Sequence, residues 1–328
     1  MRIEGKNTLV TGAGGFIGSH LVGVLVRAGA RVKAFVRYNS RSDVGLIKKL
    51  PEEIKGEIEV FPGDLKDPEA LKRPMRGSEL VFHLGSLIAI PYSYINPMDF
   101  VQTNVAGTAN LLHACLSANV AKIVHMSTSE VYGTAVYCPI NEEHPLQAQS
   151  PYSATKIAAD KLAESYYRTF GLPIAIARPF NTYGPRQSVR AVIPTIILQA
   201  LRGDQVMLGS LSPTRDLNYV EDTVRGLVDI AKTPESVGEV INIGSGKEIS
   251  IGDLARKIFL SLGKKVEICA EDERIRPANS EVARLVCDNS KAKRLLGWEP
   301  HVSLQDGLEK TVRWFESHGG EYRSFYAV

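Results

Sequence analysis

Short apolar runs alternate with amphipathic stretches through the first 180 residues of this chain. The alternation is typical of βαβ units, whose strands pair in a parallel sheet that helices cover on both faces. The expected strands are Asn7–Val10, Arg31–Val36, Glu57–Phe61, Leu80–Leu84, Lys122–Ser127 and Ile174–Arg178. The expected helices are Ile17–Ala28, Asp67–Met75, Phe100–Ala118 and Tyr152–Phe170. The pattern therefore predicts an α/β fold with a doubly wound parallel sheet.

The pattern changes after residue 180, where prolines interrupt the chain and the repeat of strand and helix is lost. We expect a dinucleotide-binding domain over residues 1–180 and a smaller substrate-binding lobe over residues 181–328. Glu239–Ile243 is another buried apolar run. We expect it to return to the main sheet, which would interleave the two parts.

Charge and composition exclude several classes of function. The 39 Lys and Arg residues exceed the 36 Asp and Glu residues by three, without the basic stretches typical of nucleic-acid binders. No apolar run reaches the length of a membrane span, and a strand beginning at Asn7 leaves no room for a signal peptide. We therefore expect a cytoplasmic protein. Its four cysteines lack CxxC spacing, which predicts reduced thiols and no metal site.

A glycine-rich segment, Thr11–Gly18, follows the first expected strand and opens the first expected helix. Its glycines, Gly12, Gly15 and Gly18, follow a GxxGxxG spacing. Glycines at such a turn let the backbone approach a diphosphate, whose charge is met by amides at the helix N-terminus. The alternative is a turn that merely packs a helix on a sheet. The context favours a Rossmann-type nucleotide site.

The second expected strand ends without the acidic residue that usually holds the ribose of NAD. Arg37 and Arg41 stand there instead and could clasp a 2′-phosphate, so the sequence favours NADP, with NAD as the alternative. A solvated surface position is the competing interpretation for both arginines. Asp64 follows the third expected strand and could accept a hydrogen bond from adenine, or could cap the next helix.

Tyr152 and Lys156 lie four residues apart, on one face of the helix that follows Pro151. A free tyrosine titrates at about 10. A neighbouring ammonium and a cationic nicotinamide ring both favour the phenolate, so Tyr152 could act as a base near neutral pH.

Together these motifs resemble the extended short-chain dehydrogenase/reductase family over nearly the whole chain. The matching segments are Thr11–Gly12 with Gly15 and Gly18, Asp64, His83–Ser86, Asn104–Thr108, Ser127–Gly133, Tyr152 with Lys156, Arg178–Asn181, and Arg215–Asp216 before Val220–Asp222. Within the family the chain is similar to nucleotide-sugar 4,6-dehydratases. Ile90–Tyr94 and Phe180–Gln187 resemble the UDP-N-acetylglucosamine 4,6-dehydratases of legionaminic- and pseudaminic-type sugar pathways.

The resemblance implies a catalytic set of Tyr152, Lys156, Thr128, Ser129 and Glu130. Tyr152 would start oxidation at C4, Thr128 would hold the C4 oxygen, and Glu130 would remove the C5 proton before water leaves C6. Ser129 stands where dTDP-glucose dehydratases have an aspartic acid. Glu130 would then carry its proton to the leaving oxygen, or Ser129 would position a water that does so. A structural ion pair is the alternative role for Glu130.

The resemblance also implies a recycled, tightly bound dinucleotide, a nucleoside-diphosphate sugar and a homodimer formed by the helices at residues 100–118 and 152–170. The candidate cofactor-binding residues are Gly12, Gly15, Phe16, Ile17, Gly18, Arg37, Ser40, Arg41, Asp64, Leu65, Leu84, Ser86, Tyr152 and Lys156. The candidate substrate-binding residues are Ser93, Asn181, Arg190, Arg215, Arg276 and Glu281, with Arg186 as a weaker candidate. Glu281 has a counterpart in GDP-mannose dehydratases where the base is recognised, so a guanine nucleotide is an alternative substrate.

Three other functions fit the same motifs. UDP-glucuronate decarboxylases share the oxidation at C4, and GDP-mannose 4,6-dehydratases share Thr128, Ser129 and Glu130. A dinucleotide-sensing binding module is the non-enzymatic alternative. Such modules usually lack the tyrosine and lysine pair that this chain has.

Overall fold

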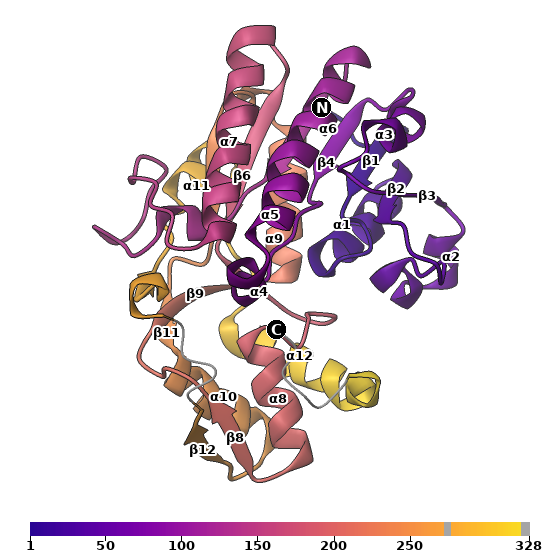
Figure 1. Ribbon diagram of the computed structural model, residues 1–328. Helices are drawn as coiled ribbons and strands as arrows, with labels where there is room; N and C mark the ends of the chain where they lie inside the picture. Colours follow the sequence, from indigo (N-terminus) through magenta and orange to yellow (C-terminus); the bar gives the residue numbers. More distant parts are fainter. Residues whose placement is uncertain (272–276, 323–328) are drawn as a thin grey trace.

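The computed structural model describes residues 1–271 and 277–322. Its centre is a parallel seven-stranded sheet with the strand order β10-β6-β5-β4-β1-β2-β3 (Figure 1). The strands are β1 (Asn7–Thr11), β2 (Arg31–Arg37), β3 (Ile58–Gly63), β4 (Leu80–His83), β5 (Lys122–Met126), β6 (Ile174–Pro179) and β10 (Val240–Ile243). The fold is therefore the doubly wound Rossmann type that the alternating pattern predicts.

Successive side chains along a strand point to opposite faces of the sheet, where they pack into two separate hydrophobic cores. Val10 and Phe82 pack with α1 (Phe16–Arg27) and α9 (Val220–Lys232), whereas the preceding Leu9 and Val81 pack with helices on the other face. Those helices are α3 (Pro68–Met75), α6 (Gly107–Ser117) and α7 (Pro151–Phe170). Strand side chains alternate between faces, so a strand that is apolar throughout needs helices on both sides.

The helix expected over Phe100–Ala118 is broken in the structure. The chain forms α5 (Pro97–Phe100), a π-helical turn (Val101–Ala106) and then α6. The buried Asn104 lies in this turn, where its amide binds Leu87 and the Thr155 hydroxyl of α7. A π turn inserts one residue into a helix, often at a functional site, and here it directs a polar side chain toward α7.

Helix α7 has clear sequence signals at both ends. Ser150 forms a capping box with Ser153, Pro151 occupies the first turn, and Gly171 ends the helix with a φ of 65°. Its 20 residues place Tyr152 and Lys156 in the first two turns, at the carboxyl ends of the sheet strands.

The second lobe contains two small sheets and several helices. Strand β9 (Thr214–Tyr219) pairs with β7 (Asn181–Tyr183), β11 (Glu248–Ser250) and β13 (Arg284–Leu285), and β8 (Gln205–Leu208) pairs with β12 (Glu267–Ala270). Its helices are α8 (Val192–Arg202), α10 (Ile251–Leu262) and α12 (Leu304–His318), whereas α11 (Ser290–Leu296) packs against β10 and α9 beside the main sheet (Figure 1). The expected strand at residues 239–243 is β10, at the edge of the main sheet beside β6.

Short helices complete the described chain: α2 (Glu52–Lys55), α4 (Ile90–Ile95) and the 3₁₀ turns Gly45–Lys49, Ser129–Tyr132, Pro234–Ser236, Ala278–Ser280 and Gly319–Glu321. Helix α4 lies at the junction of the sheet domain and the second lobe (Figure 1). Within residues 1–271 and 277–322, no helix combines the length and apolar character needed to cross a bilayer.

Candidate functional site

The glycine-rich loop is tightly packed against the backbone of its neighbours. Gly12 has a φ of 68°, and a Cβ atom there would lie 2.8 Å from the Gly85 nitrogen. A Cβ at Gly18 would lie 2.1 Å from the Gly12 oxygen. Gly15 caps α1 without a side-chain hydrogen bond, which leaves the first-turn amides to an external anion. This backbone arrangement fits the diphosphate of a dinucleotide.

A cavity of about 550 Å³ opens over this loop. Its lining includes the predicted residues Gly12, Gly15, Phe16, Ile17, Gly18, Arg37, Ser40, Arg41, Leu84 and Ser86. Arg37 and Arg41 are exposed, and neither forms an ion pair with a described residue. Their guanidinium groups are therefore available to an anion at this edge of the cavity.

The segment that follows β2 also shapes this cavity, and besides the predicted Ser40 and Arg41 it contributes residues that the sequence motifs did not indicate: Asn39, Asp43, Val44 and Gly45. The Asn39 side chain accepts hydrogen bonds from the amides of Arg41 and Asp43. A Cβ atom at Gly14 would lie 2.7 Å from the Val44 oxygen, so the segment rests directly on the glycine loop. Asx turns of this kind are a local sequence signal that could have indicated the bend.

A smaller compartment of about 150 Å³ adjoins the first and is lined by Asp64, Leu65, Ser86 and Arg37. Asp64 Oδ1 accepts from the Lys66 amide at 2.9 Å, whereas Asp67 is the residue that caps α3. The capping role considered for Asp64 is thus taken by Asp67. The carboxylate of Asp64 keeps acceptor capacity toward the compartment.

A buried histidine fixes the glycine loop from behind. Thr108 donates its hydroxyl proton to the Asn104 carbonyl at 2.6 Å, so it accepts from His83 Nε2 at 3.0 Å. His83 Nδ1 then accepts from Thr11, at 2.8 Å, and Thr11 accepts from the Gly85 amide. Burial holds the pKa of His83 well below its usual value, in keeping with this neutral tautomer.

Tyr152 and Lys156 are both buried near the end of β5. Tyr152 packs with Ile90 of α4 and with Phe100, and the Lys156 ammonium donates to the Met126 carbonyl at 2.8 Å. Burial lowers the pKa of Lys156 to about 8, and the charge of Asp160 opposes this shift. The two functional groups predicted from their spacing therefore lie in a dry environment.

The protein groups around Tyr152 raise its pKa above the usual value of about 10. Burial raises it, a hydrogen bond with the Thr128 hydroxyl lowers it, and the charges of Glu130 and Asp160 raise it further. The reason is desolvation of the phenolate, which exceeds the effect of a nearby cation. Deprotonation of Tyr152 therefore depends on positive charge close to the ring.

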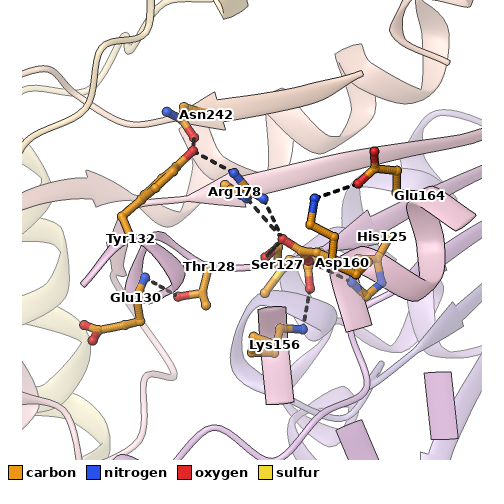
Figure 2. A network of polar contacts seen from close by, with 12 residues as sticks. His125, Ser127, Thr128, Glu130, Tyr132, Lys156, Asp160, Glu164, Arg178 and Asn242 are labelled. Atoms are coloured by element: carbon orange, nitrogen blue, oxygen red, sulfur yellow. Dashed lines mark hydrogen bonds and ion pairs between the residues drawn. The ribbon is translucent and has the colours of Figure 1, made fainter. Parts of the chain in front are cut away.

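Thr128, Ser129 and Glu130 follow β5 and form the start of the 3₁₀ turn at residues 129–132. Thr128 caps this turn by accepting from the Glu130 amide at 3.2 Å, and Ser129 is buried. The half-buried Glu130 carboxylate forms no ion pair with the described residues and points away from Arg178 (Figure 2). The structural ion pair considered for Glu130 is therefore absent from the described chain.

A second cavity, of about 570 Å³, lies between α4 and the smaller lobe. Asn181, Arg190, Arg215 and Glu281 line it, and the Asn181 Oδ1 atom is buried without a hydrogen-bond partner among the described residues. Arg215 Nη2 donates to Glu281 at 3.0 Å. Polar groups predicted from distant segments thus meet in one cavity.

Two other predicted substrate residues do not enter this cavity. Ser93 is fully buried and donates its hydroxyl to the Ile90 carbonyl at 2.6 Å, because α4 turns it inward. Its neighbours Pro91 and Tyr94 line the cavity instead. Arg186, the weaker candidate, bonds to His20 of α1. Arg276 lies outside the described residues.

The family profile described as GDP-mannose 4,6 dehydratase matches residues 9–311. A dTDP-glucose 4,6-dehydratase from Streptomyces antibioticus is 32% identical over 317 residues, 95% of this chain and 93% of the relative. A UDP-N-acetyl-alpha-D-glucosaminuronate decarboxylase from Bacillus cytotoxicus is 33% identical over 324 residues, 94% of this chain and 98% of the relative. The chain belongs to the GDP-mannose 4,6 dehydratase family of nucleotide-sugar enzymes.

Solved structures agree with this assignment. An epimerase from Methanothermobacter thermautotrophicus has a TM-score of 0.90 and 32% identity, over 97% of this chain and 94% of that one. DesIV, a dTDP-glucose 4,6-dehydratase from Streptomyces venezuelae solved with NAD, has a TM-score of 0.84 and 32% identity, over 96% and 98%. A mutant UDP-glucuronic acid 4-epimerase from Bacillus cereus, holding a UDP-sugar analogue and NAD, has a TM-score of 0.86 and 30% identity, over 94% and 99%. The protein is an enzyme of this dehydratase, decarboxylase and epimerase group.

Proposed function

We propose that this protein is a nucleotide-sugar 4,6-dehydratase whose substrate is UDP-N-acetylglucosamine. The observation that supports dehydration is the carboxylate of Glu130, which has no ion-pair partner among the described residues and lies two residues after Thr128. Its charge acts on Tyr152, so it lies near the group that starts the reaction. A half-buried, unpaired carboxylate next to a buried phenol is suited to proton transfer.

The first step of the proposed reaction is carried by the pair on α7 and by Thr128. Tyr152 takes the proton of the C4 hydroxyl, and the Lys156 ammonium favours its phenolate. The Thr128 hydroxyl, which already bonds to Tyr152, holds the C4 oxygen in place. A nicotinamide dinucleotide held by the glycine loop would supply the hydride acceptor for C4 and the hydride donor for C6, so the overall reaction involves no net oxidation.

Glu130 carries the elimination step. Once C4 is a carbonyl, the hydrogen on C5 is acidic, and Glu130 removes it while the C6 hydroxyl leaves as water. Ser129 is buried and carries no ionisable group, so we assign delivery of a proton to the leaving oxygen to Glu130 itself. When hydride is then added at C6, a proton adds at C5, which balances the proton that Tyr152 took from the C4 hydroxyl. The products are a UDP-4-keto-6-deoxy sugar and one water.

Both nicotinamide dinucleotides fit the backbone arrangement of the glycine loop. The two exposed arginines, Arg37 and Arg41, support NADP, because guanidinium groups bind a phosphate through charge-assisted hydrogen bonds. The solved relatives DesIV and the Bacillus cereus epimerase hold NAD. We propose NADP for this chain, and the choice is tested below with Arg37.

The cavity between α4 and the smaller lobe supports a nucleoside-diphosphate sugar as substrate. Arg190 and Arg215 supply positive charge for the diphosphate, and Asn181 Oδ1, which has no partner within residues 1–271 and 277–322, can accept from a hydrogen-bond donor of the ligand. The similarity of Ile90–Tyr94 and Phe180–Gln187 to UDP-N-acetylglucosamine dehydratases supports N-acetylglucosamine as the sugar. Pro91 and Tyr94 of that segment line the cavity.

A homodimer through α6 and α7 completes the proposal. These helices contact each other, and large apolar side chains along this side are exposed: Met98 by 61%, Val101 by 40% and Phe170 by 54%. Apolar side chains at such positions gain by burial against a second copy. Light scattering of the purified protein tests this, with a monomeric mass as the contrary result.

A UDP-glucuronate decarboxylase is the second candidate, since a decarboxylase is among the relatives at 33% identity. The unpaired Glu130 carboxylate would repel the carboxylate of a uronate, which favours a neutral C6 hydroxymethyl group instead. The deciding experiment incubates the enzyme separately with UDP-N-acetylglucosamine, UDP-glucuronate and GDP-mannose. Mass spectrometry should show loss of water from the first. If UDP-glucuronate loses carbon dioxide and UDP-N-acetylglucosamine is unchanged, the protein is a decarboxylase and the dehydratase proposal is wrong.

A further inference from the structure

Asp160 lies one helical turn after Lys156 on α7 and is only 2% exposed. Its Oδ2 atom accepts from Ser127 Oγ at 2.8 Å and from Arg178 Nε and Nη2 at 3.1 and 2.9 Å (Figure 2). Its Oδ1 atom lies 3.4 Å from His125 Nε2. A buried carboxylate with this many partners is costly to desolvate and holds its partners in place.

These contacts reach both ends of the catalytic turn. Ser127 directly precedes Thr128, and Arg178 extends the network by donating to the Tyr132 hydroxyl at 3.0 Å. Tyr132 in turn donates to Asn242 at 2.7 Å. The segment from Ser127 to Tyr132, which carries Thr128 and Glu130, is therefore tied to α7 through one carboxylate (Figure 2).

Asp160 also balances charge in this interior. The groups whose charges act on Asp160 are His125 of β5, Arg178 of β6 and Lys156 of its own helix, and His83 of β4 lies beside His125. Burial lowers the pKa of both histidines, so they are neutral near pH 7. The buried cations are then Lys156 and Arg178, and Asp160 is the anion between them.

We propose that Asp160 is a positioning residue for the reaction: it fixes the turn that carries Thr128 and Glu130 against the helix that carries Tyr152 and Lys156, and its charge keeps the Lys156 ammonium protonated. The inference rests on the proposed function for its activity measurement. Asp160 itself touches none of the reacting atoms. It acts through Ser127, Arg178 and Lys156.

Asp160→Asn tests the charge while keeping the shape of the side chain. Asp160 raises the pKa of Lys156 and of Tyr152, so loss of its charge lowers both. Both limbs of the pH profile of kcat/KM should therefore move to lower pH, by about one unit. Loss of structure alone would reduce the rate without moving both limbs in one direction.

The titration of Lys156 gives a second measurement that needs neither cofactor nor substrate. In protein carrying ¹⁵N-labelled lysine, the Nζ signal absent from Lys156→Arg belongs to Lys156. We expect its midpoint near 8 in the wild type and about one unit lower in Asp160→Asn. Coincident titration curves for the two proteins would overturn the electrostatic part of the proposal, whether or not the wild type dehydrates any sugar tested.

Ser127→Ala tests the positioning part separately, because it removes one hydrogen bond and leaves the carboxylate charged. We expect kcat to fall roughly tenfold, equivalent to about 1.4 kcal/mol, with KM and both pH limbs unchanged. An unchanged kcat would overturn the positioning role.

Asp160→Glu, which restores the charge, should recover the wild-type pH limbs, and it tests the role of the charge if Asp160→Asn fails to fold. If the pH limbs of Asp160→Glu move to lower pH, as expected for Asp160→Asn, the electrostatic part of the proposal is wrong.

Discussion

Arg186 Nη2 donates a hydrogen bond of 2.7 Å to Nδ1 of His20, across 166 positions of the chain. A guanidinium group has donors only, so Nδ1 is the acceptor and Nε2 carries the proton that it donates to the Pro185 carbonyl at 2.9 Å. The contact joins α1, which opens at the glycine loop, to the segment after β7 that leads to the substrate cavity. It connects the two binding regions without touching either ligand site.

This contact predicts a pH-dependent stability. Burial, together with charge repulsion from Arg186, lowers the pKa of His20 from 6.5 to about 3. Below pH 6.5, His20 therefore binds a proton in the unfolded protein but stays neutral in the folded protein. The free energy of unfolding falls as the pH drops through that range. Relative to His20→Gln, the wild type should lose about 2 kcal/mol of unfolding free energy between pH 7 and pH 5. Urea denaturation at the two pH values measures this, and parallel losses in both proteins would contradict it.

Glu130→Gln should separate oxidation from elimination. The amide cannot remove the C5 proton, so dehydration should fall by about 10² to 10⁴-fold, whereas Tyr152 can still start the reaction at C4. The check is product formation by mass spectrometry alongside the absorbance of the reduced nicotinamide. Glu164→Gln, which alters a surface carboxylate of α7, is the matched control. Dehydration by Glu130→Gln at the wild-type rate would refute the assigned role.

Tyr152→Phe should lower turnover by about 10² to 10⁴-fold because the phenol is the base for the first step. The ring still packs with Ile90 and Phe100, so folding and dinucleotide binding should be preserved. Turnover and a separate titration of the bound dinucleotide measure the two effects. A variant with weak dinucleotide binding but normal turnover at saturation would show that Tyr152 positions the cofactor instead.

Arg37→Ala should weaken NADP more than NAD. A charge-assisted hydrogen bond contributes about 1.5 to 3 kcal/mol, so the dissociation constant for NADP should rise about 10- to 100-fold. That for NAD should change little, since it lacks the 2′-phosphate. Isothermal titration of both dinucleotides compares them, with Arg168→Ala, an exposed arginine of α7, as the control. Equal weakening of both dinucleotides would speak against a 2′-phosphate contact.

The amino-acid sequence by itself determined the parallel sheet, the glycine loop and the spacing of Tyr152 and Lys156. Each depends on local regularities: strand and helix periodicity, the caps of α7, and four-residue spacing on one helix face. The predicted strands therefore agree with the structure to within two residues at their ends. The π-helical turn at residues 101–106 did not follow from the same regularities. It is linked to the tertiary hydrogen bonds of Asn104 with Leu87 and Thr155.

Tertiary structure alone decided which distant side chains meet. It turns Ser93 of α4 toward the interior and places Asp160 between Arg178 and Ser127. It also pairs Arg186 with His20 and Arg215 with Glu281. It also buries the Tyr152 phenol, which raises its pKa, and burial is a property of the packed chain. The physical reason is the same in each case: desolvation and long-range pairing depend on packing between elements, and local periodicity carries no information about which elements pack together.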